Sequence, residues 1–169
     1  MRKFDGNVLF TEDTDDGEKI LLAIEFCSAL QAGNQAWQRS GRAYSTGRAN
    51  ICPYLYIIDF VKYELDENRE RKSLRFPNAA IPYSYYNASK NWKYPAIQVY
   101  FKSEEFQPSF DSSLQNFDTS LFGENDVYSL IHGLIYEIDV NSIYASLIKK
   151  SLKVMNYMTA SNAIDTPHS

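Results

Sequence analysis

The chain has 169 residues, of which 44% are hydrophobic and 22% are charged. These proportions are typical of a single globular domain that buries about two thirds of its unfolded surface. No stretch approaches the ~18 uncharged apolar residues of a membrane-spanning helix, and the N-terminus lacks the apolar segment of a secretory signal. We therefore expect a cytoplasmic protein without membrane contact, in which Cys27 and Cys52 are reduced, buried thiols.

The net charge of −4 hides an uneven distribution along the chain. Residues 31–102 contain eleven Lys and Arg against five Asp and Glu, whereas the flanking segments contain six basic and sixteen acidic residues. A basic middle segment indicates a surface that faces a polyanion, although a chance origin is an alternative.

The N-terminal segment predicts a β-hairpin. Phe4–Phe10 is expected to form a short strand, and Thr11–Glu18 an acidic turn with the hairpin signal Asp16-Gly17. Ile20–Cys27 is expected to form the second strand. It is apolar on both faces except at Glu25, which is typical of a central strand covered on both sides.

A helix and further strands are predicted next. Asn34 can cap a helix that extends to about Tyr44. The β-branched and aromatic run Tyr54–Leu65 predicts one long strand, and Leu74–Phe76 and Tyr94–Lys102 predict two more. The segment Ile81–Trp92 has no clear pattern, and Ser103–Phe122 is expected to be irregular.

The C-terminal part predicts two helices. Apolar residues recur with the 3.6-residue helical period from Asp126 to Ile138, and a second periodic run begins at about Asn141. We therefore expect one α/β domain over residues 1–160, with a mixed central sheet flanked by helices, and a flexible tail over residues 161–169.

Glu25 is the most informative residue of the sequence, because a lone carboxylate in an apolar strand is costly unless it is paired or bound to a metal. One interpretation is a salt bridge to a neighbouring arginine. In the other, the hairpin brings Asp5 beside Glu25, and the two carboxylates bind Mg²⁺, with Mn²⁺ as a substitute. Such an ion can activate water and stabilise charge on a phosphate.

The order of these elements resembles the PD-(D/E)xK nuclease superfamily, which includes many restriction endonucleases. Phe4-Asp5-Gly6 matches the first acidic position, Ile24-Glu25-Phe26-Cys27 matches the second, and the resemblance covers roughly residues 4–65. It implies a restriction-endonuclease-like fold and Mg²⁺-dependent endonuclease activity on DNA, with Asp5 and Glu25 as catalytic metal ligands.

The sequence departs from the family pattern at two places. The family lysine two residues after the second acid is Cys27 here, and the resemblance implies that Gln35 or Arg39 on the following helix takes over its catalytic role. The family also places a helix and a strand before the first acid, but only four residues precede Asp5. The resemblance therefore implies that a larger polypeptide supplies these elements, and a homodimer is a further expectation.

The helix after Glu25 and the segment around Trp92 predict nucleic-acid contacts. Residues three and four apart share a helix face, so Gln35, Gln38, Arg39 and Arg42 can line one side. Arginine guanidinium groups suit bidentate phosphate contact, and basic residues next to aromatic ones contact phosphates and stack on bases. The predicted nucleic-acid-binding residues are Gln38, Arg42, Arg48 and Lys93. A solvated amphipathic helix explains the same pattern without function.

Two alternatives to the nuclease hypothesis remain open. A module of the same fold can bind nucleic acid without cleaving it, which the replacement of the lysine by Cys27 favours. A protein-interaction domain, in which Glu25 is only salt-bridged, is the second alternative.

Overall fold

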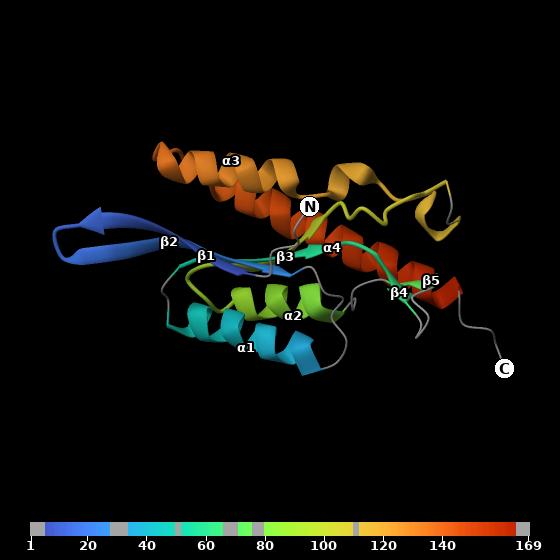
Figure 1. Cartoon of the computed structure of the whole chain (residues 1–169). Helices are drawn as coiled ribbons and strands as arrows, with labels where there is room; N and C mark the ends of the chain where they lie inside the picture. The colour runs from blue at the N-terminus through green and yellow to red at the C-terminus, as the bar shows by residue number, and fades with distance from the viewer. Residues whose placement is uncertain are drawn as a thin grey trace.

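The structure of the chain is a computed structural model that describes residues 6–27, 34–49, 52–65, 71–75, 80–109 and 112–164. A four-stranded sheet with the order β1-β2-β3-β6 has helices on both of its faces (Figure 1). β1 (Gly6–Thr14) and β2 (Gly17–Cys27) form an antiparallel hairpin, and β3 (Tyr54–Asp59) and β6 (Ala96–Phe101) continue the sheet in parallel. The predicted α/β architecture with a mixed sheet flanked by helices is confirmed.

The hairpin is longer than the sequence predicted. The acidic segment 11–18 was expected to be a turn, but β1 continues to Thr14 and only Asp15 and Asp16 lie between the strands. Cross-strand contacts stabilise the extension, because Thr11 donates a hydrogen bond to Glu18 at 3.1 Å and Lys19 pairs with Glu12 at 3.5 Å. Gly17 has a φ of 117°, a conformation that residues with a side chain rarely adopt, and begins β2 directly after the turn.

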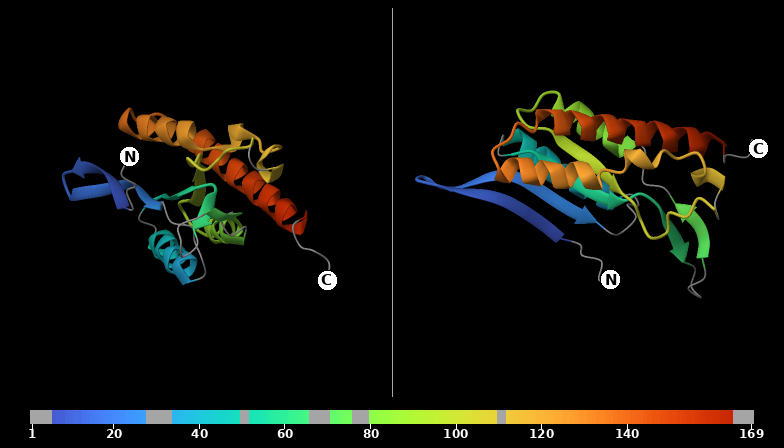
Figure 2. Two further views of the ribbon diagram at one scale, coloured as in Figure 1. Left: turned by 45° about the vertical axis from the view of Figure 1, so that its right-hand side comes forward. Right: turned by 90° about the horizontal axis from the view of Figure 1, so that it is seen from above.

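Four helices cover the sheet in two layers (Figure 1). α1 (Asn34–Arg48) and α2 (Ala80–Ser89) lie on one face, and α3 (Glu124–Ile135) and α4 (Asn141–Ile164) lie on the other. α1 extends four residues beyond its predicted end at Tyr44, and α2 was not predicted. α4 reaches Ile164, inside the segment that was assigned to the tail, and it extends past the ends of the strands (Figure 2).

The long strand predicted at Tyr54–Leu65 is interrupted. β3 ends at Asp59, and β4 (Lys62–Leu65) pairs with β5 (Arg71–Arg75) in a separate two-stranded sheet. The interruption at Phe60 and Val61 has a packing reason, since both side chains are fully buried and the ring of Phe60 stacks on Phe117 at 4.3 Å between centroids.

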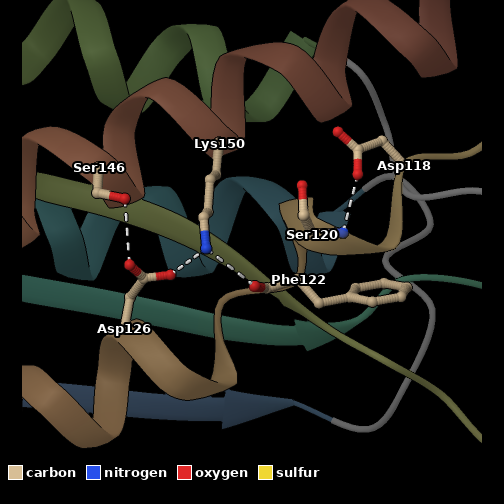
Figure 3. Close-up of polar contacts among 6 residues, drawn as sticks. All are labelled: Asp118, Ser120, Phe122, Asp126, Ser146 and Lys150. Carbon is tan, nitrogen blue, oxygen red and sulfur yellow. Dashed lines mark hydrogen bonds and ion pairs between the residues drawn. The ribbon is translucent and has the colours of Figure 1, made fainter.

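The segment Ser103–Phe122, which was predicted to be irregular, contributes Phe106, Phe117 and Phe122 to the aromatic cluster around Phe60. It contains two short 3₁₀ helices, η1 (Ser112–Leu114) and η2 (Thr119–Leu121), within otherwise irregular backbone. Polar contacts join η2, α3 and α4 (Figure 3): Lys150 pairs with Asp126, Ser146 donates to Asp126 at 3.1 Å, and Lys150 donates to the Phe122 carbonyl at 3.4 Å. These contacts join α3 to α4, the two helices on that face of the sheet.

The two faces of the sheet differ in chemistry. The buried side chains of β2, β3 and β6 on the α3–α4 face are aliphatic, namely Leu22, Ile24, Leu55, Ile57, Ile97 and Val99. The α1–α2 face carries buried polar groups among its apolar residues, namely Glu25, Tyr54, Tyr56, Gln98 and Tyr100. We call these five residues the polar face.

Candidate functional site

Glu25 lies at the centre of the candidate site, on β2 beneath α1. Its side chain is only 4% exposed, and both of its oxygens accept hydrogen bonds. Arg42 of α1 donates to Oε1 at 3.0 Å, and the hydroxyl of Tyr54, at the start of β3, donates to Oε2. Three elements that are distant in the sequence therefore meet at one carboxylate.

The local sequence explains this arrangement. In the parallel register, Ala23 lies opposite Tyr54, so Tyr54 and Glu25 both project from the α1–α2 face of adjacent strands. The small side chain of Ala23 leaves room for the tyrosine to reach along the sheet to the carboxylate. Burial, followed by the hydrogen bond to Glu25, raises the pKa of Tyr54 well above its usual range. The hydroxyl therefore keeps its proton and acts as a donor at physiological pH.

The ion pair at Glu25 is unequal in exposure. The Arg42 side chain is 58% exposed while the Glu25 side chain is 4% exposed, so the acid is inside and the cation reaches solvent. The Asp126–Lys150 pair on the other face is more even, at 18% and 26%. Lys150 is further fixed by the Phe122 carbonyl. Arg42 is thus more exposed than Lys150, which has a second hydrogen-bond acceptor within the fold.

The polar face continues from Glu25 across the sheet. Glu25 lies opposite Tyr56 on β3, and Tyr56 lies opposite Gln98 on β6. Gln98 is 1% exposed, and neither atom of its amide has a hydrogen-bond partner among the described residues. The hydroxyl of Tyr100 is likewise buried without a hydrogen-bond partner in the described part of the chain. A buried polar group without a hydrogen-bond partner costs free energy.

The described residues do not by themselves form the predicted metal site. The register places Asn7 opposite Glu25, so Asn7, not Asp5, is its direct neighbour across the hairpin. Asp5 lies outside the described residues. Within the described ranges there is no group of three or more His, Cys, Asp or Glu side chains that could hold a metal ion. Each oxygen of Glu25 accepts a hydrogen bond from a protein donor, Arg42 or Tyr54.

The side chains predicted to replace the family lysine, those of Gln35 and Arg39, lie outside the described residues. Cys27 is a buried thiol, 4% exposed, on the same face of β2 as Glu25. The backbones of Gln35, Gln38 and Arg39 lie in α1, as predicted, but their side chains are outside the described residues. Their assigned roles stay predictions.

Arg48 and Lys93 belong to two segments that pack together. Tyr44 of α1 meets Trp92 edge-on at 5.5 Å between ring centroids. A Cβ on Gly47 would lie 2.0 Å from Cε3 of Trp92, so only glycine allows α1 to approach the indole this closely. Arg48 follows directly at the end of α1, and Lys93 follows Trp92. The structure thus brings the predicted basic helix and the predicted basic–aromatic segment into contact.

The charges of these two segments are all of one sign. Residues 34–49 and 80–102 contain three arginines and three lysines, and no Asp or Glu. Arg42, Arg48, Lys90, Lys93 and Lys102 are exposed. Acidic residues are concentrated instead at the hairpin turn, which projects beyond the helices (Figure 1). The charged residues of these two segments are therefore all basic.

Sequence reasoning missed two members of the site. Tyr54 was interpreted only as a strand residue. Its signal in the sequence is weak: a residue with a polar hydroxyl begins a strand, and the neighbouring strand contains a buried acid. Gln98 gave a clearer signal that was not used: it is a lone amide within the apolar run of β6, in the same way that Glu25 is a lone acid within β2.

Comparisons with protein-family models, with curated proteins and with solved structures gave no significant match. In the part of the chain that the structure describes, no helix is both long and apolar enough to cross a membrane.

Proposed function

We propose that this chain cleaves DNA by hydrolysis of phosphodiester bonds, at the site formed by Glu25, Arg42 and Tyr54. The observation that carries the proposal is the buried carboxylate of Glu25 paired with a solvent-exposed arginine. Replacing a buried ion pair by apolar residues is often neutral or stabilising, so such a pair is weak evidence for a structural role. A group that stability does not require, at the meeting point of three elements, is better explained by chemistry.

The proposed roles follow from the charges. Arg42 would bind a phosphate, because a guanidinium group offers two parallel donors to phosphate oxygens. Release of Arg42 would leave the Glu25 carboxylate beside the bound phosphate, with Tyr54 fixing its orientation. In the reaction a water oxygen attacks phosphorus, the bond from phosphorus to the leaving oxygen breaks, and the proton of the water ends on that oxygen. Mg²⁺, or Mn²⁺ in its place, remains part of the proposal through Asp5, which lies outside the described residues.

The test is cleavage of supercoiled plasmid in Mg²⁺ or Mn²⁺ by the wild type, Arg42→Gln and Lys149→Gln. Lys149 is a matched control, because it is exposed on α4 in the other layer. We expect loss of one phosphate-binding donor to slow cleavage by about 10²–10³, and Lys149→Gln to cleave like the wild type. Gln35→Ala and Arg39→Ala are expected to slow cleavage by a similar factor while DNA binding survives. Equal rates for Arg42→Gln and the wild type would reject the site.

A second candidate function is binding of nucleic acid without cleavage. The specific observation that favours it is that Arg42 and Tyr54 already engage both oxygens of Glu25. In this case DNA affinity should fall steeply with salt, with a log–log slope of about −0.9 per phosphate contact, and Arg42→Gln should flatten that slope by about one contact. DNA binding with this behaviour, and no cleavage in either metal, would establish the second function and reject the first.

A further inference from the structure

A cleft of about 350 Å³ lies where the parallel strands β3 and β6 begin. The segments that precede β3 and β6 form one side of it, including Cys52 and Lys93. Lys19 and its neighbours near the start of β2 form a second side, and the beginning of α4 forms the third, including Asn141 and Tyr144. The size is at the lower end of the range for small-molecule sites.

The lining combines an apolar floor with two cations. Ile20, Leu21, Pro53, Pro95, Leu134 and Val140 contribute aliphatic surface. Lys19 and Lys93 are the charged residues among the described lining residues, and none of these is acidic. The contact of Lys19 with Glu12 is a surface ion pair at 3.5 Å, with side chains 63% and 43% exposed. Such pairs are weak, so Lys19 can turn to a ligand at little cost.

Tyr144 supplies the second, independent observation. The residue is 9% exposed, and its hydroxyl has no hydrogen-bond partner in the part of the chain that the structure describes. Burial, followed by the proximity of the Cys52 thiol, raises the pKa of this hydroxyl above its usual range. The hydroxyl is therefore a protonated, unused donor next to another lining residue of the cleft. A buried donor without a partner is costly, and a ligand acceptor would remove that cost.

We propose that this cleft binds a small organic anion, with an apolar or aromatic body and one carboxylate, sulfonate or phosphate group. The body lies on the aliphatic floor, Lys19 and Lys93 pair with the negative group, and the Tyr144 hydroxyl donates to it. The N-terminus of α4 contributes less, because Asp139 already accepts a hydrogen bond from the Asn141 amide at 2.9 Å. The inference uses neither Glu25 nor Arg42 of the proposed cleavage site, and it shares with the predicted nucleic-acid surface only Lys93.

The test uses two fluorescent probes that have the same aromatic body but different charge. One is 1-anilinonaphthalene-8-sulfonate, an anion, and the other is N-phenyl-1-naphthylamine, which is neutral. Each is titrated into the wild type, the double variant Lys19→Gln/Lys93→Gln, Tyr144→Phe and Lys102→Gln. Lys102 is a matched control, because it is exposed at the opposite end of β6. Melting temperatures are recorded without probe.

We expect the anionic probe to bind more tightly than the neutral one. The double lysine variant should weaken the anionic probe by about tenfold, as expected for a lost charged hydrogen bond, and leave the neutral probe unchanged. Tyr144→Phe should weaken the anionic probe severalfold, with a melting temperature equal to or above that of the wild type. Lys102→Gln should change neither affinity. Equal affinity for the two probes, or an anionic affinity that neither Tyr144→Phe nor the double variant changes, would overturn the proposal.

Discussion

The two faces of the central sheet are built from the same strands but differ in the chemistry of their buried side chains. On the α3–α4 face, the buried side chains of β2, β3 and β6 are apolar, and the Asp126–Lys150 ion pair joins α3 to α4. On the α1–α2 face, an acid, an amide and three tyrosines are buried against the sheet itself. The buried side chains of one face are apolar, whereas the other face keeps polar groups among its buried side chains.

The contrast indicates which face of the sheet to test for a functional site. Apolar cores are interchangeable in chemistry, so the α3–α4 face gives no information about activity. Buried polar groups have to be satisfied by named partners, and the partners of Glu25 come from α1 and β3. The polar face and the exposed basic residues of α1 lie in the same layer, which is the basis of the proposed activity.

The largest expected effect is on the apolar face. Leu55 is fully buried at the centre of β3, so Leu55→Ala should lower the free energy of unfolding by about 2–5 kcal/mol. Its counterpart on the polar face is Gln98→Leu, which removes an amide that has no hydrogen-bond partner among the described residues. We expect Gln98→Leu to be neutral or stabilising by about 1 kcal/mol. Urea denaturation measures both, and equal losses would show that the two faces do not differ.

The second effect separates two tyrosines of the polar face. Tyr54→Phe removes the donor to Glu25, and leaving a buried acceptor short of a partner should cost about 1–3 kcal/mol. Tyr100→Phe removes a hydroxyl without a hydrogen-bond partner in the described ranges, so it should be neutral or slightly stabilising. Thermal unfolding of the two variants gives the order directly. Greater destabilisation by Tyr100→Phe would contradict the assignment of Tyr54 as the partner of Glu25.

The third effect is a loss of stability in alkali. Burial raises the pKa of Tyr100, and burial followed by the bond to Glu25 raises that of Tyr54. Above about pH 10 the unfolded chain loses these protons while the folded chain keeps them, so unfolding becomes more favourable. Each such tyrosine should contribute a loss of about 1.4 kcal/mol per pH unit. Urea denaturation between pH 9 and 11 should show a smaller slope for Tyr100→Phe, and an unchanged slope would count against its burial.

The smallest effect is expected outside both faces. Glu12 and Lys19 form an exposed ion pair between the two strands of the hairpin. Glu12→Gln should change the free energy of unfolding by less than about 0.5 kcal/mol, because exposed pairs gain little in water. The same urea titrations provide this value. A loss above 1 kcal/mol would mean that the extended hairpin depends on this pair.

The sequence was sufficient where a regular pattern decides the structure. The alternation and apolar runs of β2, β3 and β6, and the periodicity of α3 and α4, predicted the sheet and its upper layer. It was not sufficient where long-range packing decides. The break at Phe60 depends on an aromatic cluster with Phe117 and Phe106, more than 40 residues away in the chain. α2 contains Pro82 and three tyrosines, and its weak pattern did not predict a helix.

The candidate site was likewise predicted only in part: residue types indicated some of its members, and long-range packing determined the others. Glu25 and Arg42 were identified from their residue types, and a salt bridge of Glu25 to a neighbouring arginine was one of the two interpretations. The identity of that arginine, the contribution of Tyr54 and the position of Asn7 opposite Glu25 depend on strand register and helix placement. A one-residue change of register exchanges the two faces of a strand, and no local pattern fixes it to that precision.

The central claim is that Glu25, the acid of the polar face, takes part in cleavage, whereas Asp126, the acid of the α3–α4 layer, only stabilises the fold. The most direct measurement compares Glu25→Gln with Asp126→Asn, two substitutions that replace a carboxylate of an ion pair by an amide of the same shape. Each variant is assayed for plasmid cleavage in Mg²⁺ and for its free energy of unfolding. We predict that Glu25→Gln lowers cleavage at least 10²-fold, and that Asp126→Asn cleaves like the wild type but loses about 1 kcal/mol of stability. Wild-type cleavage by Glu25→Gln, or a loss of cleavage in Asp126→Asn at unchanged stability, would contradict the account.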